Sequence, residues 1–440
     1  MKVLLILAGI AELKAHHPVR YPVMSPPLTL LLLAAICRRA GHEVEMIDTR
    51  LFMERSAGGG WVLNEARIGA AIARSDAEVA GISFLSSGAP DGFRVASLCK
   101  AQGKTVIGGG LHASVALAEF TASGAFDYLI QGEAEEALPS LLCGLERGTQ
   151  ERFTRAPVVL RAQTLRDLQL VPAIEDYSLY APVFEQYGSK RSIYVETSRG
   201  CFKSCAFCEV AKTGAAWTNL RRIPTRTVMR SIERAVSDYD VNYVLITDSV
   251  ATAFKRHFLE FVAEMRASFP GVSLQLNSTV DCWDEERARA CHGLSCSIWF
   301  GFESGSQRML DFLQKGTTVE LAFEAARLCR QYEIPCAFNV LLGVPGETEE
   351  DYRQTLEVFE RCTWVYPNPN IFNPLPGTAL HHYCEQHMLT RAGRSYDIWD
   401  AERIERENVG PVKGVDYGLV LKYYRRLTEL QDEPQRSLSK

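Results

Sequence analysis

Short apolar runs that alternate with helical stretches constrain the fold of this chain more than any other feature. The pattern occurs twice, first from Met1 to about residue 145 and again from about residue 189 to about residue 380. Such alternation is typical of parallel sheets whose faces are covered by helices. The chain has 440 residues, which is too many for one ordinary hydrophobic core and agrees with at least two domains.

We therefore predict an α/β protein with two parallel sheets. The predicted parts are an N-terminal Rossmann-like domain over residues 1–145, a linker over 146–188, a partial (β/α)6 barrel over 189–380 and a helical C-terminal region over 381–440. The second series holds about six strand–helix units, fewer than the eight of a full barrel.

Ligands of parallel sheets bind beyond the carboxyl ends of the strands. In the first series these ends are the loops Ala8–Ile10, Phe84–Ser87 and Gly108–His112. The glycines at 108–110 let backbone approach a ligand, although the same residues also suit an ordinary turn.

Composition excludes several classes of protein. The formal net charge is -5, which offers no general attraction for nucleic acid or anionic lipid. The apolar run "LTLLLLAAIC" is too short to span a bilayer, and "MKVLLILAGI" resembles a buried first strand more than a signal peptide. The 13 cysteines are scattered apart from one group, which argues against a secreted disulfide framework. We expect a cytoplasmic protein.

The one cysteine group is Cys201, Cys205 and Cys208 in "CFKSCAFC", directly after the first strand of the second series. A structural zinc site requires four closed ligands, and a dithiol redox pair would leave the third thiol unused. Soft thiolates also bind iron–sulfur clusters, and three thiolates on a 4Fe-4S cluster leave one iron open. Zinc and a simple cluster of buried thiols remain the alternatives.

This spacing, with Phe207 before the last cysteine, resembles the signature of the radical S-adenosylmethionine (radical SAM) superfamily. Later strand ends resemble the family's successive motifs, and the resemblance covers about residues 190–385: "LITDSVATAF", "GFESGSQRMLDFLQKG", "FNVLLGVPGETEEDYRQTLEVF" and "FNPLPGTAL". The resemblance implies a 4Fe-4S cluster on the three cysteines, whose open iron chelates SAM. It also implies a 5′-deoxyadenosyl radical that abstracts hydrogen from a small-molecule substrate, and an electron donor such as flavodoxin, ferredoxin or a dedicated reductase.

The resemblance assigns further residues to SAM. Phe207 would lie near the adenine, and Asp248 would meet the methionine amino group, where opposite charges pair strongly in a dry site. Asn277 and Glu303 would bind the ribose or the methionine carboxylate. For these two residues, capping of a strand end is the competing interpretation.

Other polar residues of the second series have less definite roles. Glu347 and Thr348, in "GVPGET", are interpreted as caps of the following helix. Glu196, Asp281 and Asn373 are candidates for substrate contacts, and the sequence does not rank them. We assign no catalytic acid or base.

The first series resembles the cobalamin-binding-type Rossmann domain that is fused to many radical SAM enzymes, through "GISFLSS", "VIGGGLHAS" and "YLIQGEAEEALPSLL". The resemblance implies cobalamin as a further cofactor, with Ser86, Gly109 and His112 among the residues that bind it. The D-x-H-x-x-G motif, whose histidine ligates cobalt in the wider group, is absent. We therefore expect no histidine on cobalt. A first domain that binds nothing and serves as a scaffold is the alternative.

Two activities compete on this evidence. We favour cobalamin-dependent methylation of a carbon in a biosynthetic small molecule. The alternative is a cobalamin-independent dehydration or rearrangement, for example that of an aminoglycoside diol dehydratase. A tRNA methylthiotransferase is disfavoured because Cys37, Cys99 and Cys143 stand singly and the tail is not basic. We expect no nucleic-acid partner and no membrane span.

Overall fold

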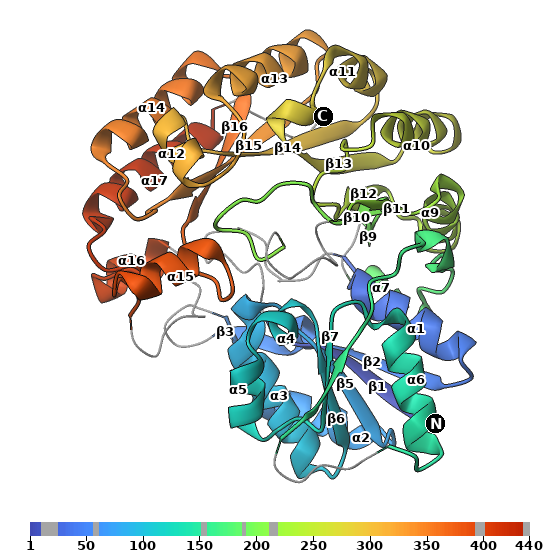
Figure 1. Ribbon diagram of the computed structural model, residues 1–440. Coiled ribbons are helices and arrows are strands. Elements are labelled where there is room, and N and C mark those ends of the chain that lie inside the picture. Colours follow the sequence, from blue (N-terminus) through green and yellow to red (C-terminus); the bar gives the residue numbers. More distant parts are fainter. Residues whose placement is uncertain are drawn as a thin grey trace. The chain divides into compact units, whose positions relative to one another are not determined.

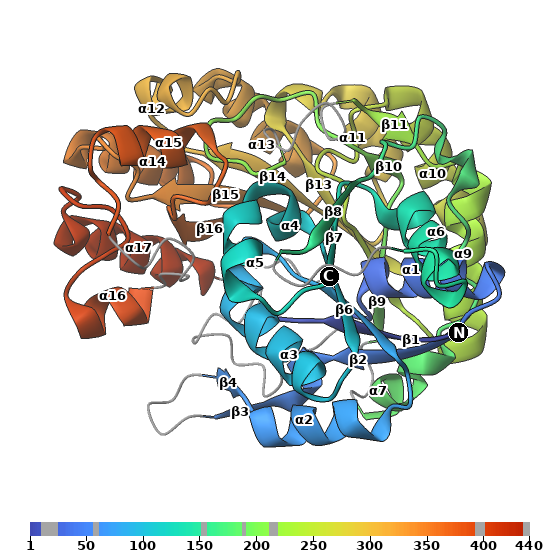
Figure 2. The ribbon, with the colours of Figure 1, turned by 60° about the horizontal axis from the view of Figure 1, so that its bottom comes forward.

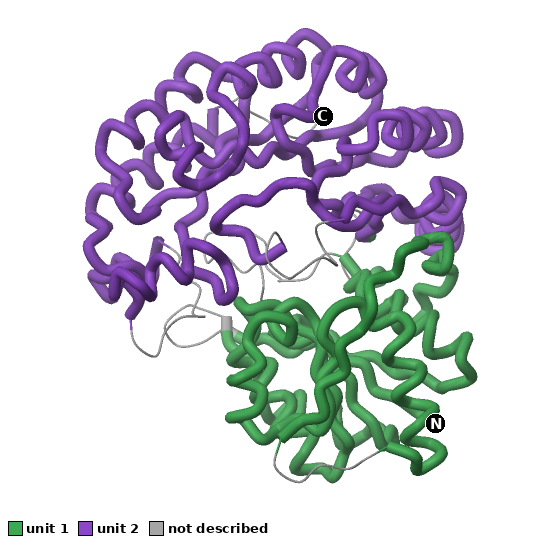
Figure 3. Tube along the Cα trace, viewed as in Figure 1, with its two compact units in different colours: residues 1–193 green, residues 194–440 purple. Residues whose placement is uncertain are grey.

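The computed structural model of the chain describes residues 1–9, 25–55, 61–150, 156–186, 191–210, 219–391 and 401–433. The chain divides into two compact units, Met1–Ile193 and Tyr194–Lys440, which Figure 3 colours separately. Within the described ranges, no helix combines the length and the apolar character that crossing a membrane requires.

Unit 1 is built on a six-stranded sheet of order β2-β1-β5-β6-β7-β8, in which every pairing is parallel. Its strands are β1 (Lys2–Leu7), β2 (Glu43–Asp48), β5 (Val79–Ser83), β6 (Thr105–Gly109), β7 (Tyr128–Gln131) and β8 (Val158–Arg161). Its helices are α1 (Leu28–Arg39), α2 (Glu65–Arg74), α3 (Ala89–Ala101), α4 (Leu111–Val115), α5 (Leu117–Ser123), α6 (Ala134–Glu146) and α7 (Ala181–Gln186). A small hairpin, β3 (Met53–Arg55) and β4 (Trp61–Leu63), lies outside this sheet.

Each face of the unit 1 sheet has its own core, because successive strand residues point to opposite faces. Val3 and Leu5 pack with α1 and α6, whereas Leu4 and Ile6 pack with α2, α3 and α5. Figure 2 shows α1 and α6 on one side of the sheet, and α2, α3 and α5 on the other. The parallel sheet covered on both faces confirms the predicted fold of this half.

Strand β8 lies within the stretch that the sequence suggests is a linker. It extends the sheet by pairing with β7, with Tyr128 opposite Val158 and Gln131 opposite Arg161. The predicted boundary at residue 145 therefore falls before the last strand of the sheet. The strand is short, and no α-helix follows it before Ala181, so the strand–helix alternation that marks the other strands is missing here.

Unit 2 contains a second six-stranded sheet, of order β16-β15-β14-β13-β12-β9. Its strands are β9 (Ser192–Val195), β12 (Tyr243–Ile246), β13 (Ser273–Ser278), β14 (Cys296–Glu303), β15 (Cys336–Leu342) and β16 (Val365–Ile371). The pairings from β12 to β16 are all parallel. The sheet is open between β16 and β9, which is the partial barrel expected from six strand–helix units.

Helices follow the strands of unit 2. They are α9 (Thr225–Tyr239), α10 (Lys255–Ser268), α11 (Glu285–Cys291), α12 (Gln307–Phe312), α13 (Val319–Gln331) and α14 (Glu349–Arg361), and then α15 (Ala379–Gln386), α16 (Ala401–Glu407) and α17 (Tyr417–Gln431). Figure 1 shows α10, α11, α13 and α14 along one side of the sheet. On that side Phe302 and Phe338 pack 5.0 Å apart between ring centres, and Phe359 of α14 contacts both. The helical C-terminal region agrees with the prediction.

Candidate functional site

The three clustered cysteines lie on a loop, Gly200–Val210, that follows β9 and the two-residue strand β10 (Ser198–Arg199). Backbone hydrogen bonds hold this loop on two sides. The Ala206 N–H donates to the carbonyl of Leu313 at 2.8 Å, and the Leu380 N–H donates to the carbonyl of Ala206 at 2.8 Å. The end of α12 and the start of α15 therefore fix the middle of the loop, and the thiols project from a supported backbone.

The thiols occupy unequal environments. Cys205 is only 6% exposed, whereas Cys201 and Cys208 are half-buried. Burial raises the pKa of the Cys205 thiol to about 11, and the nearby Lys315 ammonium partly opposes this increase. A buried thiolate is therefore unfavourable until a cation binds it.

The distances between the thiols bear on which metal group they fit. Among the described residues, only His381, His382 and Glu385 form a trio of potential ligands whose atoms all lie within 4.8 Å of one another. Three sulfurs around one tetrahedral zinc would lie roughly 3.8 Å apart, because each Zn–S bond is about 2.3 Å long. Cys201, Cys205 and Cys208 do not form such a trio, so their sulfurs do not all lie within 4.8 Å of one another. Three soft ligands at wider spacing suit an iron–sulfur cluster.

A buried ion pair lies beside this loop. Glu303 ends β14 with a φ of 75°, at an irregularity in the pairing with β15, and it accepts a hydrogen bond of 2.7 Å from Lys315 Nζ. Lys315 is 7% exposed, and its Nζ lies 5.7 Å from the centre of the Phe207 ring. Burial alone would lower the pKa of Lys315, but Glu303 and the thiols of Cys205 and Cys208 raise it overall. The structure thus brings Phe207, Glu303 and the cysteine loop together.

Lys315 is a residue that the sequence analysis missed. Its ammonium stays charged in a protected site beside the cysteine loop, where it is placed to attract a ligand carboxylate. Gly301 makes its position possible, since a Cβ on that residue would lie 2.6 Å from Lys315 Nζ. The only signal in the sequence is a lone lysine twelve residues after Glu303, at the end of a helix.

Asp248 follows β12, and its carboxylate is already occupied. It accepts hydrogen bonds from the backbone N–H of Thr197 at 2.7 Å, from Thr197 Oγ1 at 2.6 Å and from Ser198 Oγ at 2.6 Å. Its side chain is 2% exposed, and burial raises its pKa to about 6. Asp248 therefore fastens the segment that leads into the cysteine loop to the end of β12. Its contact with the SAM amino group remains a prediction.

Asn277 lies on β13, where its Nδ2 donates to the carbonyl of Ile246 at 3.3 Å. The backbone carbonyl of Asn277 accepts from the N–H of Ala251 at 2.8 Å. The side chain is half-buried, so it braces two strand ends and still reaches the surface of the sheet. Its predicted SAM contact is compatible with this position and remains a prediction.

The further polar candidates each have protein partners. Glu196 accepts from Arg199 at 2.8 Å, and Asp281 accepts from Lys203 at 2.6 Å. Asn373 donates to the carbonyl of Ile371 at 3.0 Å. These contacts lie at the ends of strands, and none of them by itself identifies a substrate contact.

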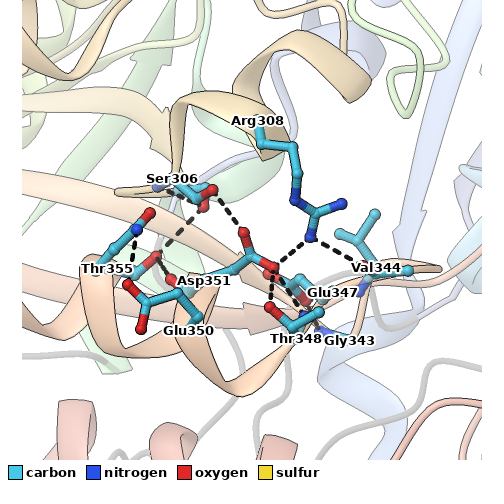
Figure 4. A network of polar contacts seen from close by, with 12 residues as sticks. Ser306, Arg308, Gly343, Val344, Glu347, Thr348, Glu350, Asp351 and Thr355 are labelled. Atoms are coloured by element: carbon cyan, nitrogen blue, oxygen red, sulfur yellow. Dashed lines mark hydrogen bonds and ion pairs between the residues drawn. The ribbon is translucent and has the colours of Figure 1, made fainter.

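A polar network supports the loop that carries Glu303 (Figure 4). Asp351, in the first turn of α14, accepts from Ser306 Oγ at 2.6 Å, from the Thr348 N–H at 2.8 Å and from Thr348 Oγ1 at 2.6 Å, and it forms an ion pair with Arg308. Burial would raise the pKa of Asp351, but Arg308, Ser306 and Thr348 hold it at about 2. The loops after β14 and β15 are thereby joined to each other.

The two residues interpreted as helix caps behave differently. Thr348 is the N-cap of α14, and with Asp351 it completes a capping box, as predicted. The cap role of Glu347 is wrong, because its Oε2 turns back to accept from the N–H groups of Gly343 at 2.7 Å and Val344 at 2.9 Å (Figure 4). Burial raises the pKa of Glu347 to about 8.

Unit 1 has its own strand-end site. The strand order changes direction between β1 and β5, the position where open parallel sheets bind ligands. There two backbone segments nearly touch, since a Cβ on Gly9 would lie 2.3 Å from the Cα of Gly88. Leu85, just after β5, is 46% exposed, and a Cβ on Gly109 would meet no atom within 4 Å. Among the residues that the structure describes here, the strand ends present glycine backbone and the apolar side chain of Leu85, and Ile10 lies outside the described residues.

Ser86 and His112 lie beneath this surface. His112 is fully buried, with its Nδ1 3.0 Å from Ser86 Oγ and with the rings of Phe84 and Phe120 each 5.6 Å away. Ser86 is also fully buried. In this position both side chains support the loops from below. Their contacts with a cofactor, and that of Gly109, remain predictions, whereas the side chain of Leu85 is exposed beside them.

Cys282 is a second residue whose position the sequence does not predict. It belongs to the short turn after β13, yet it lies near enough to Cys201 that the thiol of Cys201 contributes to raising its pKa, after burial and Asp281. Cys282 and Cys143 are half-buried. The other cysteines outside the loop are buried: Cys37, Cys99, Cys291, Cys296, Cys329, Cys336, Cys362 and Cys384. Burial raises the pKa of the Cys37 and Cys99 thiols to about 12 and that of Cys384 to about 11, which keeps these thiols protonated.

Comparisons with known proteins match both parallel-sheet parts of the chain. Residues 195–359 match the model of the radical SAM superfamily, and residues 20–142 match that of the B12 binding domain. The chain is 24% identical over 416 residues to an uncharacterized methyltransferase of Pyrococcus horikoshii, covering 91% of this chain and 88% of that protein. It is 24% identical over 328 residues to the bacteriochlorophyllide d C-12(1)-methyltransferase of Chlorobaculum tepidum, covering 73% of this chain and 68% of that protein.

A solved structure shares the fold. The radical SAM methyltransferase TsrM of Kitasatospora setae, with tryptophan and a SAM analogue bound, superposes with a TM-score of 0.69 at 19% identity, covering 88% of this chain and 76% of that one. The two matched models fall on the two sheets, with the three thiols at the start of the second. This chain is a radical SAM enzyme of the branch with an N-terminal B12 binding domain.

Proposed function

We propose that this enzyme transfers a methyl group to a carbon of a small molecule, with cobalamin and SAM as cofactors. The observation that carries the proposal is the presence of two different strand-end sites in one chain. One presents Cys201, Cys205 and Cys208 beside a buried Lys315. The other presents backbone and the exposed Leu85, with His112 buried. The methyltransferases of Pyrococcus horikoshii and Chlorobaculum tepidum support the same activity.

The residues of unit 2 fit a 4Fe-4S cluster and SAM. Cys201, Cys205 and Cys208 would hold the cluster, Lys315 would attract the methionine carboxylate and Phe207 would lie against the adenine. When bound, the reduced cluster supplies the electron that cleaves SAM, and cobalamin supplies the methyl group. Asp248 and the Asp351 network do not react. They keep the cysteine loop and the Glu303 loop in place, so that the cofactor meets preformed contacts.

Cobalamin fits the unit 1 site through shape and apolar contact. Two glycine backbones, at Gly9 and Gly88, approach each other closely at the strand ends, and the exposed Leu85 would contact the corrin. No cobalt ligand is assigned, because the imidazole of His112 lies below the surface. A radical dehydratase with an empty first domain is disfavoured, because a B12 binding domain matches this unit.

We further propose a small-molecule substrate, a reducing cytoplasmic environment and a flavodoxin, ferredoxin or dedicated reductase as electron donor. The cations of α17 are engaged in ion pairs, Lys422 with Glu349, Arg425 with Glu405 and Arg426 with Glu429. This helix therefore presents no unpaired basic stripe of the kind that binds RNA. The cysteine loop requires reduced thiols, a condition that the cytoplasm maintains.

Anaerobic turnover with SAM that carries a CD3 methyl group tests this function. The reconstituted protein, supplied with cobalamin and a reductant, is incubated with a small-molecule extract. We expect one product to gain a CD3 group, with S-adenosylhomocysteine from the methyl donor and 5′-deoxyadenosine from the SAM that is cleaved. The Cys205→Ala variant serves as the inactive control. A product that loses water, with no label transferred, would refute methylation and favour the dehydratase.

A further inference from the structure

The strands of unit 2 are unusual in carrying amides rather than charges. In the six strands of its large sheet, as the structure describes them, the only charged residue is Glu303, which is already paired with Lys315. Five carboxamides lie in the same strands: Gln275, Asn277, Asn339, Asn368 and Asn370. Strands of a parallel sheet covered on both faces are normally almost entirely apolar. Amides at these positions indicate that one face of the sheet meets a polar but uncharged ligand.

The carboxamides lie on the face opposite the helices. Phe338 and Val340 of β15 are buried, whereas Asn339 between them is half-buried. The register places Gly301, Asn339 and Asn368 side by side on β14, β15 and β16, so their side-chain positions share one face. Figure 1 shows these three strands next to one another, with α13 and α14 on their other side.

Asn339 and Asn368 together present one donor and one acceptor. Asn368 Nδ2 donates to Asn339 Oδ1 at 2.7 Å, which fixes the orientation of both amides. This bond leaves Asn339 Nδ2 as a donor and Asn368 Oδ1 as an acceptor, and within the described ranges neither atom has another hydrogen-bonding partner. A donor beside an acceptor is the complement of an amide edge, which presents C=O and N–H together.

The surroundings of this pair add two features. On β14 the neighbouring position is Gly301, over which Lys315 Nζ lies, so the pair adjoins the proposed SAM site. Two residues earlier on each of the same three strands, Trp299 and Tyr366 lie on either side of Ala337. The centres of their rings are 6.5 Å apart. The Trp299 Nε1–H is shielded from water and has no acceptor among the described residues. A planar group with an acceptor would satisfy it.

We propose that the substrate presents an uncharged amide edge to Asn339 and Asn368, and that a planar group attached to this edge lies beside Trp299 and Tyr366. A lactam, a carboxamide or the equivalent edge of a heterocycle would fit, whereas a carboxylate, a phosphate or an amidine would not. This inference rests on the proposed function, because it places the substrate next to the SAM site. It adds a substrate class, and it names Asn339 and Asn368 as residues that determine specificity.

Three probes of one shape test the donor and acceptor pattern. Benzamide presents one acceptor and one donor, benzoate two acceptors with a negative charge, and benzamidine two donors with a positive charge. Binding is measured by ligand-observed NMR on the anaerobic protein with cluster and SAM but without reductant, so no turnover is needed. We expect benzamide to bind at least about tenfold more tightly than the other two, a difference of about 1.4 kcal/mol. A failure of methylation would leave this result unchanged.

The Asn339→Asp substitution sharpens the test. It replaces the donor by a charged acceptor, so benzamidine should become the preferred probe and benzamide should lose at least about tenfold in affinity. Gln331→Glu is the matched control, because it makes the same chemical change, from amide to carboxylate, at an exposed residue of α13. It should leave the order of the three probe affinities unaltered. Equal binding of the three probes, a preference for benzoate, or no binding of benzamide at about 10 mM would overturn the proposal. The wild-type comparison is decisive even if the variant does not fold.

Discussion

The strand-end sites of unit 1 and unit 2 have the same position on a parallel sheet but differ in the chemistry of their residues. Both lie beyond the carboxyl ends of a parallel sheet, where loops converge and backbone groups are available. The unit 1 site consists of glycine backbone and Leu85, whereas the unit 2 site consists of thiols, a buried lysine and carboxylates. In unit 1, the charged or polar side chains Ser86 and His112 lie under the surface. In unit 2, Lys315 and Glu303 form a buried ion pair directly beside the cysteine loop.

The difference follows from what each ligand requires. A corrin ring is broad and largely apolar on its faces, so shape and excluded water suffice to bind it, and a buried charge there would be unfavourable. SAM carries a carboxylate, an ammonium and a sulfonium, which need fixed partners in a protected site. One protein can therefore use rigid backbone for one cofactor and charge pairing for the other. Four experiments test this contrast.

Loss of a thiol should have the largest effect. We expect the anaerobically reconstituted protein to hold about four irons per chain, and the Cys205→Ala variant to hold almost none, because the buried thiol is one of only three ligands. Cobalamin binding by unit 1 should persist in the variant. Iron and sulfide analysis, with the visible spectrum, measures both.

Cys282→Ala is the informative control, since Cys282 lies near Cys201 but outside the loop. It should retain the full iron content. If Cys282→Ala also lost iron, or if wild-type protein held about eight irons per chain, the assignment of one cluster to three cysteines would be wrong.

Removal of the buried Lys315 ammonium should have the second largest effect. Lys315→Met leaves Glu303 buried without its partner and removes the attraction for a carboxylate, so SAM affinity should fall about 100-fold, or about 2.7 kcal/mol. Equilibrium dialysis with labelled SAM measures this change. The exposed ion pair of Lys255 with Asp284 and Glu286 provides a control, because Lys255→Met should have almost no effect. Equal losses of SAM affinity in the two variants would show that Lys315 has no specific role in binding SAM.

A charge placed in the unit 1 site should have a smaller but selective effect. Leu85→Asp puts a carboxylate where the corrin would lie, and cobalamin content should fall at least about tenfold while iron content stays constant. The Leu170→Asp substitution, at a leucine of the same unit that is 66% exposed, should change neither the cobalamin content nor the iron content. The position of the corrinoid absorption bands should not change in His112→Phe. A shift of these bands would instead identify His112 as a cobalt ligand.

The smallest effect concerns pH. The folded pKa of Glu347 is about 8, above the ordinary value for a glutamate, so its neutral form is favoured in the native loop. Its contribution to stability is complete below the ordinary value of about 4.5, is lost by up to about 1.4 kcal/mol per pH unit as the pH rises from there to about 8, and does not change further above 8. Hydrogen exchange at the Gly343 and Val344 amides, corrected for intrinsic rates, should therefore accelerate between pH 5 and pH 8 and level off above pH 8. The Glu347→Gln substitution should abolish this acceleration. If the exchange still accelerates in the variant, the titration of another group is responsible.

The sequence predicts the fold well because the decisive signals are local. Apolar runs of five to eight residues followed by helices identify the longer strands, and the spacing of Cys201, Cys205 and Cys208 predicts a metal-binding loop. Thr348 is predicted as a cap because the capping signal lies within four residues. Strand β8 escapes detection because it is short and no α-helix follows it before Ala181.

Residues whose roles depend on tertiary contacts are not predictable in this way. Lys315 is recognisable only once β14 places Glu303 and Gly301 against it, and Cys282 only once the turn after β13 approaches Cys201. The sequence locates Asp248 at a strand end, but not the three donors from Thr197 and Ser198 that occupy its carboxylate. Likewise, the amide pair of Asn339 and Asn368 arises from strand register, which joins residues 29 positions apart.

The uneven burial of the cysteines has a practical consequence for following the metal centre. Alkylating reagents attack thiolates, so the fully enclosed and protonated thiols such as Cys99 and Cys329 should resist iodoacetamide at neutral pH. Cys201 and Cys208 are partly accessible, and their sulfurs would be shielded whenever iron is bound to them. Cys143, half-buried in unit 1, provides an internal reference for reagent exposure. Peptide mass spectrometry after a short alkylation pulse would therefore report the fraction of molecules that carry a cluster, without any measurement of colour or turnover.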